Sequence, residues 1–83
     1  MIPIKTYYSN VIFSAEGCKD LHGTVIHHDN APDEIETCWK LSEEELKHIA
    51  QTGCIYLYTM GRWIPPVMLS VKSTVDTEER CYG

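Results

Sequence analysis

Residue types suited to binding a metal gather in the first half of the chain, as two cysteines and three histidines. Cysteine thiolates and neutral imidazoles are the usual ligands of zinc. Their spacing matches no common zinc module, and no two cysteines form a C-x-x-C pair. We therefore expect ordinary thiols and no bound metal, and the alternative is a small zinc-binding domain. The five residues concerned are Cys18, His22, His27, His28 and Cys38.

Catalytic motifs are scarce in this sequence. Ser70 lacks the context of a nucleophile elbow, and a pairing of Cys18 with His22 rests on residue type alone. The neighbouring carboxylates at 33–34 and 43–45 fit a solvated loop and the start of a helix. Neither the phosphate-binding loop motif nor the dinucleotide-binding glycine motif occurs. The sequence therefore predicts a protein that is not an enzyme, with no catalytic residue and no cofactor.

A binding surface has better support, because the chain has more aromatic residues than a small core needs. Trp63 follows Arg62 in a loop that the consecutive prolines 65–66 stiffen. An indole beside a guanidinium suits a hot spot for a protein partner or a platform for a nucleobase. The alternative is a tryptophan that folds back over the sheet edge. We predict a binding site at Arg62 and Trp63, with Tyr7 and Tyr8 as weaker members.

Negative charge is concentrated in the middle of the chain. Residues 29–45 contain seven acidic side chains and one lysine, and the whole chain has a net charge of −5. This balance disfavours direct binding to duplex DNA or RNA, which requires a basic surface. The acidic segment is a competing binding surface for a basic partner, through Glu34, Glu36 and Glu43. The alternative is a solvated loop and helix start.

A helix is the clearest of the elements that must position these residues. Ser42 and Glu45 have the spacing of a capping box, and Gly53 supplies the left-handed residue that ends a helix. The sequence therefore predicts a helix over residues 43–52. A helix this short needs a sheet beneath it, so its apolar face should pack inward. That face consists of Leu46, Ile49 and Ala50.

Strands are predicted on both sides of this helix. Residues 35–41 alternate between apolar and polar side chains, and 67–72 alternate again. The run 54–60 is apolar or aromatic on both faces, which places it in the centre of a sheet, in a hairpin with 67–72. Trp39 and one of the two tyrosines at 56 and 58 are expected in the core.

The first half is less regular. Residues 4–8 and 10–13 are expected to form short strands or one irregular stretch, 24–28 a further short strand, and 29–33 a loop. The predicted fold class is α+β: a small antiparallel β-sheet of about five short strands packed with one α-helix, about residues 43–52.

Length and targeting signals give the domain organisation. A chain of 83 residues supports one domain, residues 1–83, whose tail at 74–83 is expected to fray unless Cys81 and Tyr82 dock. No apolar run approaches the ~20 residues of a membrane span. The first residues do not resemble a signal peptide, so we expect a cytoplasmic protein with reduced cysteines.

Self-association is predicted from a poorly protected sheet edge. The expected strand 67–72 carries a single charge, Lys72, and its prolines precede it. Pairing with a second copy would cover that edge and bring two loops with Arg62 and Trp63 together, so we predict a homodimer.

The second half of the chain resembles small phage and prophage proteins of uncharacterised function. The similar residues are CWKLSEEEL at 38–46, Ile49, TG at 52–53, IYL at 55–57, Gly61 and PPV at 65–67. The resemblance covers residues 37–72 and implies no site residue. It implies non-enzymatic action in the bacterial host cytoplasm. We expect an antagonist of a host defence system that binds a defence protein or a small nucleotide signal. The alternative is an accessory or structural phage protein with no inhibitory role.

Overall fold

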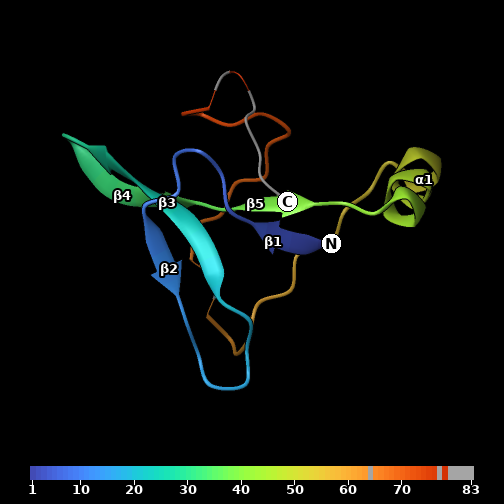
Figure 1. Cartoon of the computed structure of the whole chain (residues 1–83), viewed down its shortest axis with the longest axis horizontal. Helices are drawn as coiled ribbons and strands as arrows, with labels where there is room; N and C mark the ends of the chain where they lie inside the picture. Colours follow the sequence, from blue (N-terminus) through green and yellow to red (C-terminus); the bar gives the residue numbers. More distant parts are fainter. Residues whose placement is uncertain (64, 77, 79–83) are drawn as a thin grey trace.

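Five short strands and one helix form the regular part of the described residues. The computed structural model describes residues 1–63, 65–76 and 78 (Figure 1). The elements in order are β1 (Ile2–Ile4), β2 (Val11–Phe13), β3 (Leu21–His28), β4 (Ala31–Glu36), β5 (Cys38–Lys40) and α1 (Glu43–Thr52). All strand pairs are antiparallel. The predicted α+β class, with five strands and one helix, is confirmed.

The strands form two sheets. One has the strand order β2-β3-β4 and the other pairs β1 with β5. The chain changes sheet at Thr37, because Glu36 pairs with Thr24 of β3 whereas Cys38 pairs with Ile4 of β1. The single strand predicted over 35–41 is therefore wrong, since two shorter strands replace it. Trp39 is exposed rather than in the core, and its indole donates to Thr37 Oγ1 at 3.0 Å.

A tight hairpin joins β3 to β4 where a loop over 29–33 was expected. His28 pairs with Ala31, so the turn consists of Asp29 and Asn30 alone, and the loop prediction is wrong. The ladder is irregular between Ile26 and His28. Pro32 lies opposite this irregularity, and a proline has no N–H with which to continue a ladder. Its place in the sequence had suggested a loop, but an edge strand with a bulge accommodates it.

Helix α1 has the predicted bounds and the predicted caps. The Ser42 side chain accepts from the Glu45 N–H, and Gly53 ends the helix at φ 68°. The expected inward packing is wrong, however, because no residue of α1 is buried and Leu46 is 54% exposed. Figure 1 shows the reason: the helix lies at one end of the molecule, beyond the two-stranded sheet. The short sheets extend no layer beneath its apolar face.

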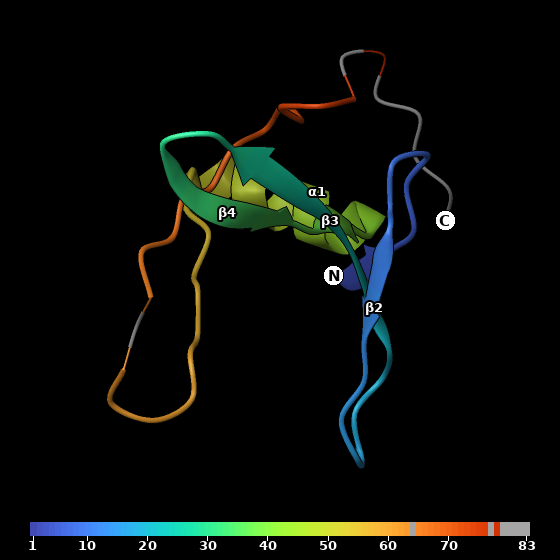
Figure 2. The ribbon, with the colours of Figure 1, turned by 90° about the vertical axis from the view of Figure 1, so that its left-hand side faces the viewer.

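The residues after the helix form long loops rather than the predicted hairpin. No described residue of 53–76 lies in a strand, so the strands expected at 54–60 and 67–72 are wrong. Both tyrosines at 56 and 58 are exposed, which corrects the expectation that one is in the core. A strand that is apolar on both faces needs layers on both sides. The two small sheets supply none, and the segment extends away from them (Figure 2).

The chain buries very little apolar surface on itself. Ile4 is the single hydrophobic side chain that is buried among the described residues. The accessible surface is 7503 Å², whereas a compact monomer of this mass would expose about 5,000 Å². The radius of gyration is 14.0 Å, against about 12 Å for a compact domain of this length. Apolar surface that a domain of this size ordinarily buries is therefore accessible.

Candidate functional site

Three of the four most exposed large hydrophobic side chains among the described residues lie on one loop, residues 57–63, which we call the arm. Tyr58 is 88% exposed, Met60 96% and Trp63 85%. The predicted pair Arg62 and Trp63 therefore lies in solvent and does not fold back on a sheet edge. Gly61, at φ 82°, provides the left-handed turn that precedes this pair. An exposed run of this kind is typical of an interaction surface.

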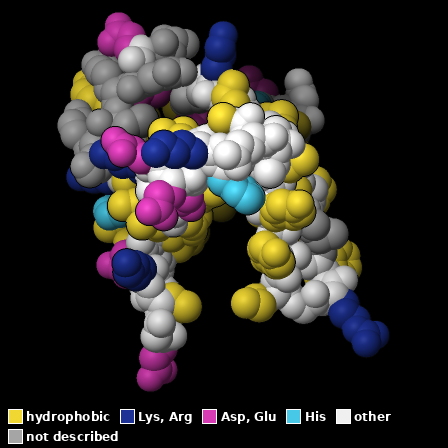
Figure 3. Space-filling view, turned by 90° about the vertical axis from the view of Figure 1, so that its right-hand side faces the viewer, with side chains coloured by type: hydrophobic (Ala, Val, Ile, Leu, Met, Phe, Trp, Pro, Cys, Tyr) yellow, Lys and Arg dark blue, Asp and Glu magenta, His cyan; other side chains and the backbone are white. Residues whose placement is uncertain are grey.

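The arm borders an open hollow. Figure 3 shows two projections separated by this hollow: the arm and the loop that joins β2 to β3. Hydrophobic side chains follow the arm on the side that faces the hollow (Figure 3). A concave surface with one apolar wall can receive a segment of a protein partner.

The predicted tyrosines lie elsewhere, in the turn that follows β1. The rings of Tyr7 and Tyr8 pack edge to face, with their centroids 5.0 Å apart. Thr6, just before them, is buried, and its N–H donates to Ser9 Oγ at 2.9 Å. The structure thus gives the two tyrosines a local contact of their own, on a different element from Arg62 and Trp63.

The three predicted acidic residues have separate environments. Glu43 lies in the first turn of α1, where negative charge favours the helix. Glu36 holds the residues that follow the long loops: its carboxylate accepts from Ser73 Oγ at 2.8 Å, and from the N–H and Oγ1 of Thr74, each at 3.1 Å. Of the predicted tail, residues 77 and 79–83, with Cys81 and Tyr82, lie outside the described residues. The Glu36 carboxylate is thus hydrogen-bonded within the chain, and the Glu34 carboxylate contacts His28.

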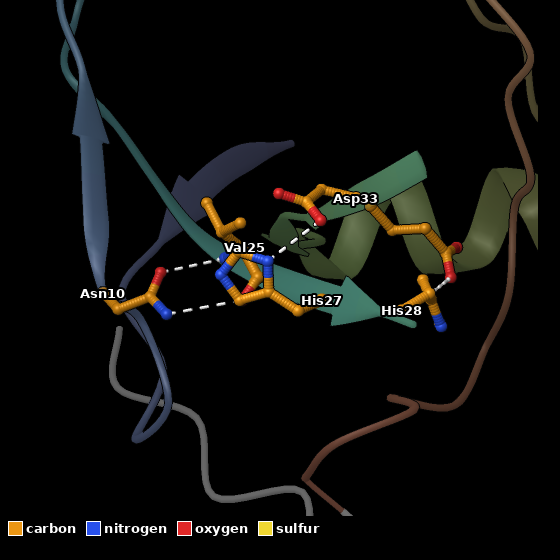
Figure 4. Close-up of polar contacts among 6 residues, drawn as sticks. Asn10, Val25, His27, His28 and Asp33 are labelled. Carbon is orange, nitrogen blue, oxygen red and sulfur yellow. Dashed lines mark hydrogen bonds and ion pairs between the residues drawn. The ribbon is translucent and has the colours of Figure 1, made fainter. Parts of the chain in front are cut away.

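Two histidine–carboxylate pairs cross the hairpin of β3 and β4, and sequence reasoning missed both. His27 Nδ1 lies 2.9 Å from Asp33 Oδ1, and His28 Nε2 contacts Glu34 Oε1 (Figure 4). On the other side of β3, the Asn10 side chain accepts from the Val25 N–H at 2.9 Å (Figure 4). The signal was a pair of histidines just before the two-residue turn at 29–30 and a pair of carboxylates shortly after it, since a hairpin brings the two strands beside each other.

A further carboxylate, Glu45, joins the chain terminus to the helix start. Its Oε1 accepts from the Met1 ammonium at 2.5 Å and from the Ser42 N–H at 2.9 Å. The hydrogen bond from the ammonium, followed by the one from the Ser42 backbone, lowers the pKa of Glu45 below its ordinary value. This carboxylate completes the capping box and ties α1 to β1.

Two open cavities among those of the described residues are relevant to binding. The first, about 470 Å³, lies between α1 and the start of the following loop, and we call it the helix groove. It is lined by Met1, Glu44, Glu45, His48, Ile49, Cys54, Ile55 and Tyr56. The second, about 360 Å³, lies beside β2 and is lined by Lys5, Ser9, Asn10, Val11, Ile12 and His22. Neither cavity is lined by Arg62 or Trp63.

The candidate metal ligands are not brought together. Among the described residues, no three His, Cys, Asp or Glu side chains lie close enough to hold an ion. His27 and His28 each contact a carboxylate of β4 instead, Cys18 is exposed in the turn between β2 and β3, and Cys38 lies in β5. The geometry therefore gives the zinc alternative no support.

The candidate nucleophile has a local structural contact. The Ser70 hydroxyl donates to the Lys72 carbonyl at 2.9 Å and accepts from the Lys72 N–H at 3.1 Å. These two bonds close a turn within the loop. No described contact places a general base beside this hydroxyl.

Comparisons with known proteins complete the description. Within the described residues, no helix has both the length and the apolar character needed to cross a membrane. The chain matches no protein-family model, no curated protein and no solved structure.

Proposed function

We propose that this protein is a non-enzymatic binding protein that acts by capturing a protein partner, and that the arm is its contact surface. The observation that carries the proposal is the exposure of Tyr58, Met60 and Trp63 on one loop. Aromatic residues, methionine and arginine are enriched at protein interfaces, and tryptophan, tyrosine and arginine are the commonest hot spots. The seven residues of the arm include a tyrosine, a methionine, an arginine and a tryptophan.

A protein partner fits the arm better than a small nucleotide does. A small-molecule site buries most of its ligand in a concave pocket. Arg62 and Trp63 line neither of the two cavities described above, and Trp63 is 85% exposed. A broad apolar surface of a protein can cover such an arm, whereas a nucleotide would be enclosed on one side only.

The arm is also a better candidate than the acidic segment. The carboxylates of Glu34 and Glu36 already contact His28 and the residues at 73–74. A partner would have to replace these contacts in order to use the carboxylates. Within the part of the chain that the structure describes, no hydrogen bond or ion pair engages a side chain of the arm.

The resemblance to phage proteins supports a bacterial host as the place of action. On this basis the partner is a component of a host defence system in the bacterial cytoplasm, which the protein antagonises by stoichiometric binding. If the captured partner were instead a phage particle protein, the accessory or structural role would replace this one.

Capture from host lysate tests the proposal, followed by titration of the purified partner. We expect Trp63→Ala to weaken the complex by roughly thirtyfold or more, as for a hot-spot residue. Trp39→Ala is the matched control, because it removes an exposed indole from β5, away from the arm. Both variants should retain the wild-type circular dichroism spectrum.

Three results would overturn the proposal. Equal binding by the Trp63 variant would exclude the arm. Loss of binding only when Glu34, Glu36 and Glu43 are changed to Gln would assign the acidic segment. A nucleotide that is recovered with the protein at one per chain would favour signal sequestration.

A further inference from the structure

The surface of the chain contains an apolar groove and, separately, an apolar segment that nothing covers. The helix groove has Ile49 on the helix side and Ile55 on the loop side. The segment is residues 67–71, VMLSV, which carries no charge. Val71 is 97% exposed, and Val67, Met68 and Leu69 are exposed as well. Each surface lacks a cover within the described part of its own chain.

We propose that the two surfaces cover each other between two copies, so that residues 67–71 of each copy occupy the helix groove of the other. This arrangement is an isologous dimer with a two-fold axis, in which every contact occurs twice. It does not depend on the proposed function, because the arm takes no part in it.

The accessible area supports a second copy as the occupant. The chain exposes 7503 Å², about 2,500 Å² more than a compact monomer of its mass. Burying only half of that excess on each copy would give an interface of about 2,500 Å² in total, which lies in the range of obligate homodimers. A dimer of this kind would supply the apolar layer that α1 lacks in the single chain.

The charges at the two surfaces are complementary. The rim of the groove carries Glu44 and Glu45, while Lys72 directly follows the apolar segment. Glu45 is already engaged with the Met1 ammonium and the Ser42 N–H. An inserted segment would therefore bring its lysine to Glu44 at the rim, where opposite charges fix the register of an interface.

Light scattering on the purified full chain tests the dimer. We expect twice the mass of one 9.5 kDa chain at tens of micromolar. Ile49→Glu and Val71→Glu should each raise the dissociation constant on the order of a hundredfold or more, because each buries an unpaired charge. The matched control is Ile12→Glu, which places the same charge at an exposed isoleucine of β2, outside both surfaces.

A charge exchange distinguishes this contact from a structural role of the same residues. Glu44→Lys alone and Lys72→Glu alone should each weaken the dimer. The double variant should restore it, because each new lysine meets a new glutamate of the other copy. Circular dichroism identifies any variant that fails to fold.

Three outcomes would refute the proposal. A wild-type monomer at tens of micromolar would exclude a second copy as the occupant. Failure of the double variant to recover would exclude the Glu44–Lys72 contact and with it this register. A dimer that survives both Ile49→Glu and Val71→Glu would place the interface elsewhere on the chain.

Discussion

Replacement of Ser42 by alanine is the most direct test of how α1 is held. Ser42 Oγ accepts from the Glu45 N–H at 3.2 Å, and this bond satisfies one of the amide groups that a helix start leaves without a partner. An N-cap of this type contributes about 1 kcal/mol. Because no residue of α1 is buried within its own chain, packing cannot compensate for the loss.

The expected effect of Ser42→Ala is a loss of about 1 kcal/mol in the free energy of unfolding. For a chain of this length, such a loss lowers the melting temperature by about 4–8 °C. Thermal melts followed by circular dichroism at matched protein concentration measure it. Ser42→Asn is the conservative control, since asparagine is an equally good N-cap and should leave the melt unchanged.

A second control separates the cap from a general effect of losing a serine. Ser70→Ala removes a hydroxyl whose bonds stay within one turn of an exposed loop, so it should change the free energy of unfolding by less than about 0.5 kcal/mol. Equal melting of wild type and Ser42→Ala would refute the reasoning, as would an equal loss in Ser42→Asn.

Three other properties follow from contacts in the structure. Glu36→Gln should speed hydrogen exchange at the Thr74 amide, because a neutral amide replaces the carboxylate that accepts this N–H and forms a weaker hydrogen bond. Unchanged protection of this amide would contradict the contact. The pKa of Glu45 is lowered on folding, so its contribution to stability is complete above the ordinary glutamate pKa. That contribution is lost as the pH falls through the lowered value, and Glu45→Gln should abolish this part of the acid dependence of the melt. Titration of denatured, unreduced protein should find four thiols per chain and elemental analysis no stoichiometric zinc, whereas one zinc per chain would restore the metal alternative.

The helix could be predicted from the sequence because all of its signals are local. The serine and glutamate of the capping box lie three residues apart, and the glycine that ends the helix adjoins it. Such signals depend on the backbone of a few residues, so they hold wherever the helix lies in the fold. The packing of its apolar face depends on distant strands, and that part of the prediction was wrong.

The strands, unlike the helix, depend on partner strands elsewhere in the chain. An alternating or apolar run indicates that a segment suits a sheet, but it does not show that a neighbouring strand is present. Residues 54–60 and 67–72 have the pattern without the partners, and both remain outside the sheets. Conversely, Pro32 suggested a loop although it lies within β4, because an irregular ladder there needs no N–H from it.

The sequence left two positions open for the tryptophan of the arm. Trp63 could project from its loop or fold back over a sheet edge, and the structure has it 85% exposed. The histidine–carboxylate pairs were not predicted, because they depend on the two-residue turn that brings β4 beside β3. Once that turn is known, the hairpin places both histidines of β3 within reach of the carboxylates of β4.

The arm and the apolar segment 67–71 can bind different molecules at the same time, because they are separate parts of the chain. Prolines 65–66 lie between the arm and the apolar segment 67–71, and consecutive prolines restrict the backbone to extended geometry. Seating the segment in the groove of a second copy would therefore fix the base of each arm while leaving its aromatic side chains free. A two-fold dimer would then present two arms, and a partner with two matching surfaces would bind both with higher affinity than either arm alone provides. Loss of the dimer should consequently weaken capture of a two-fold symmetric partner while a single arm still binds.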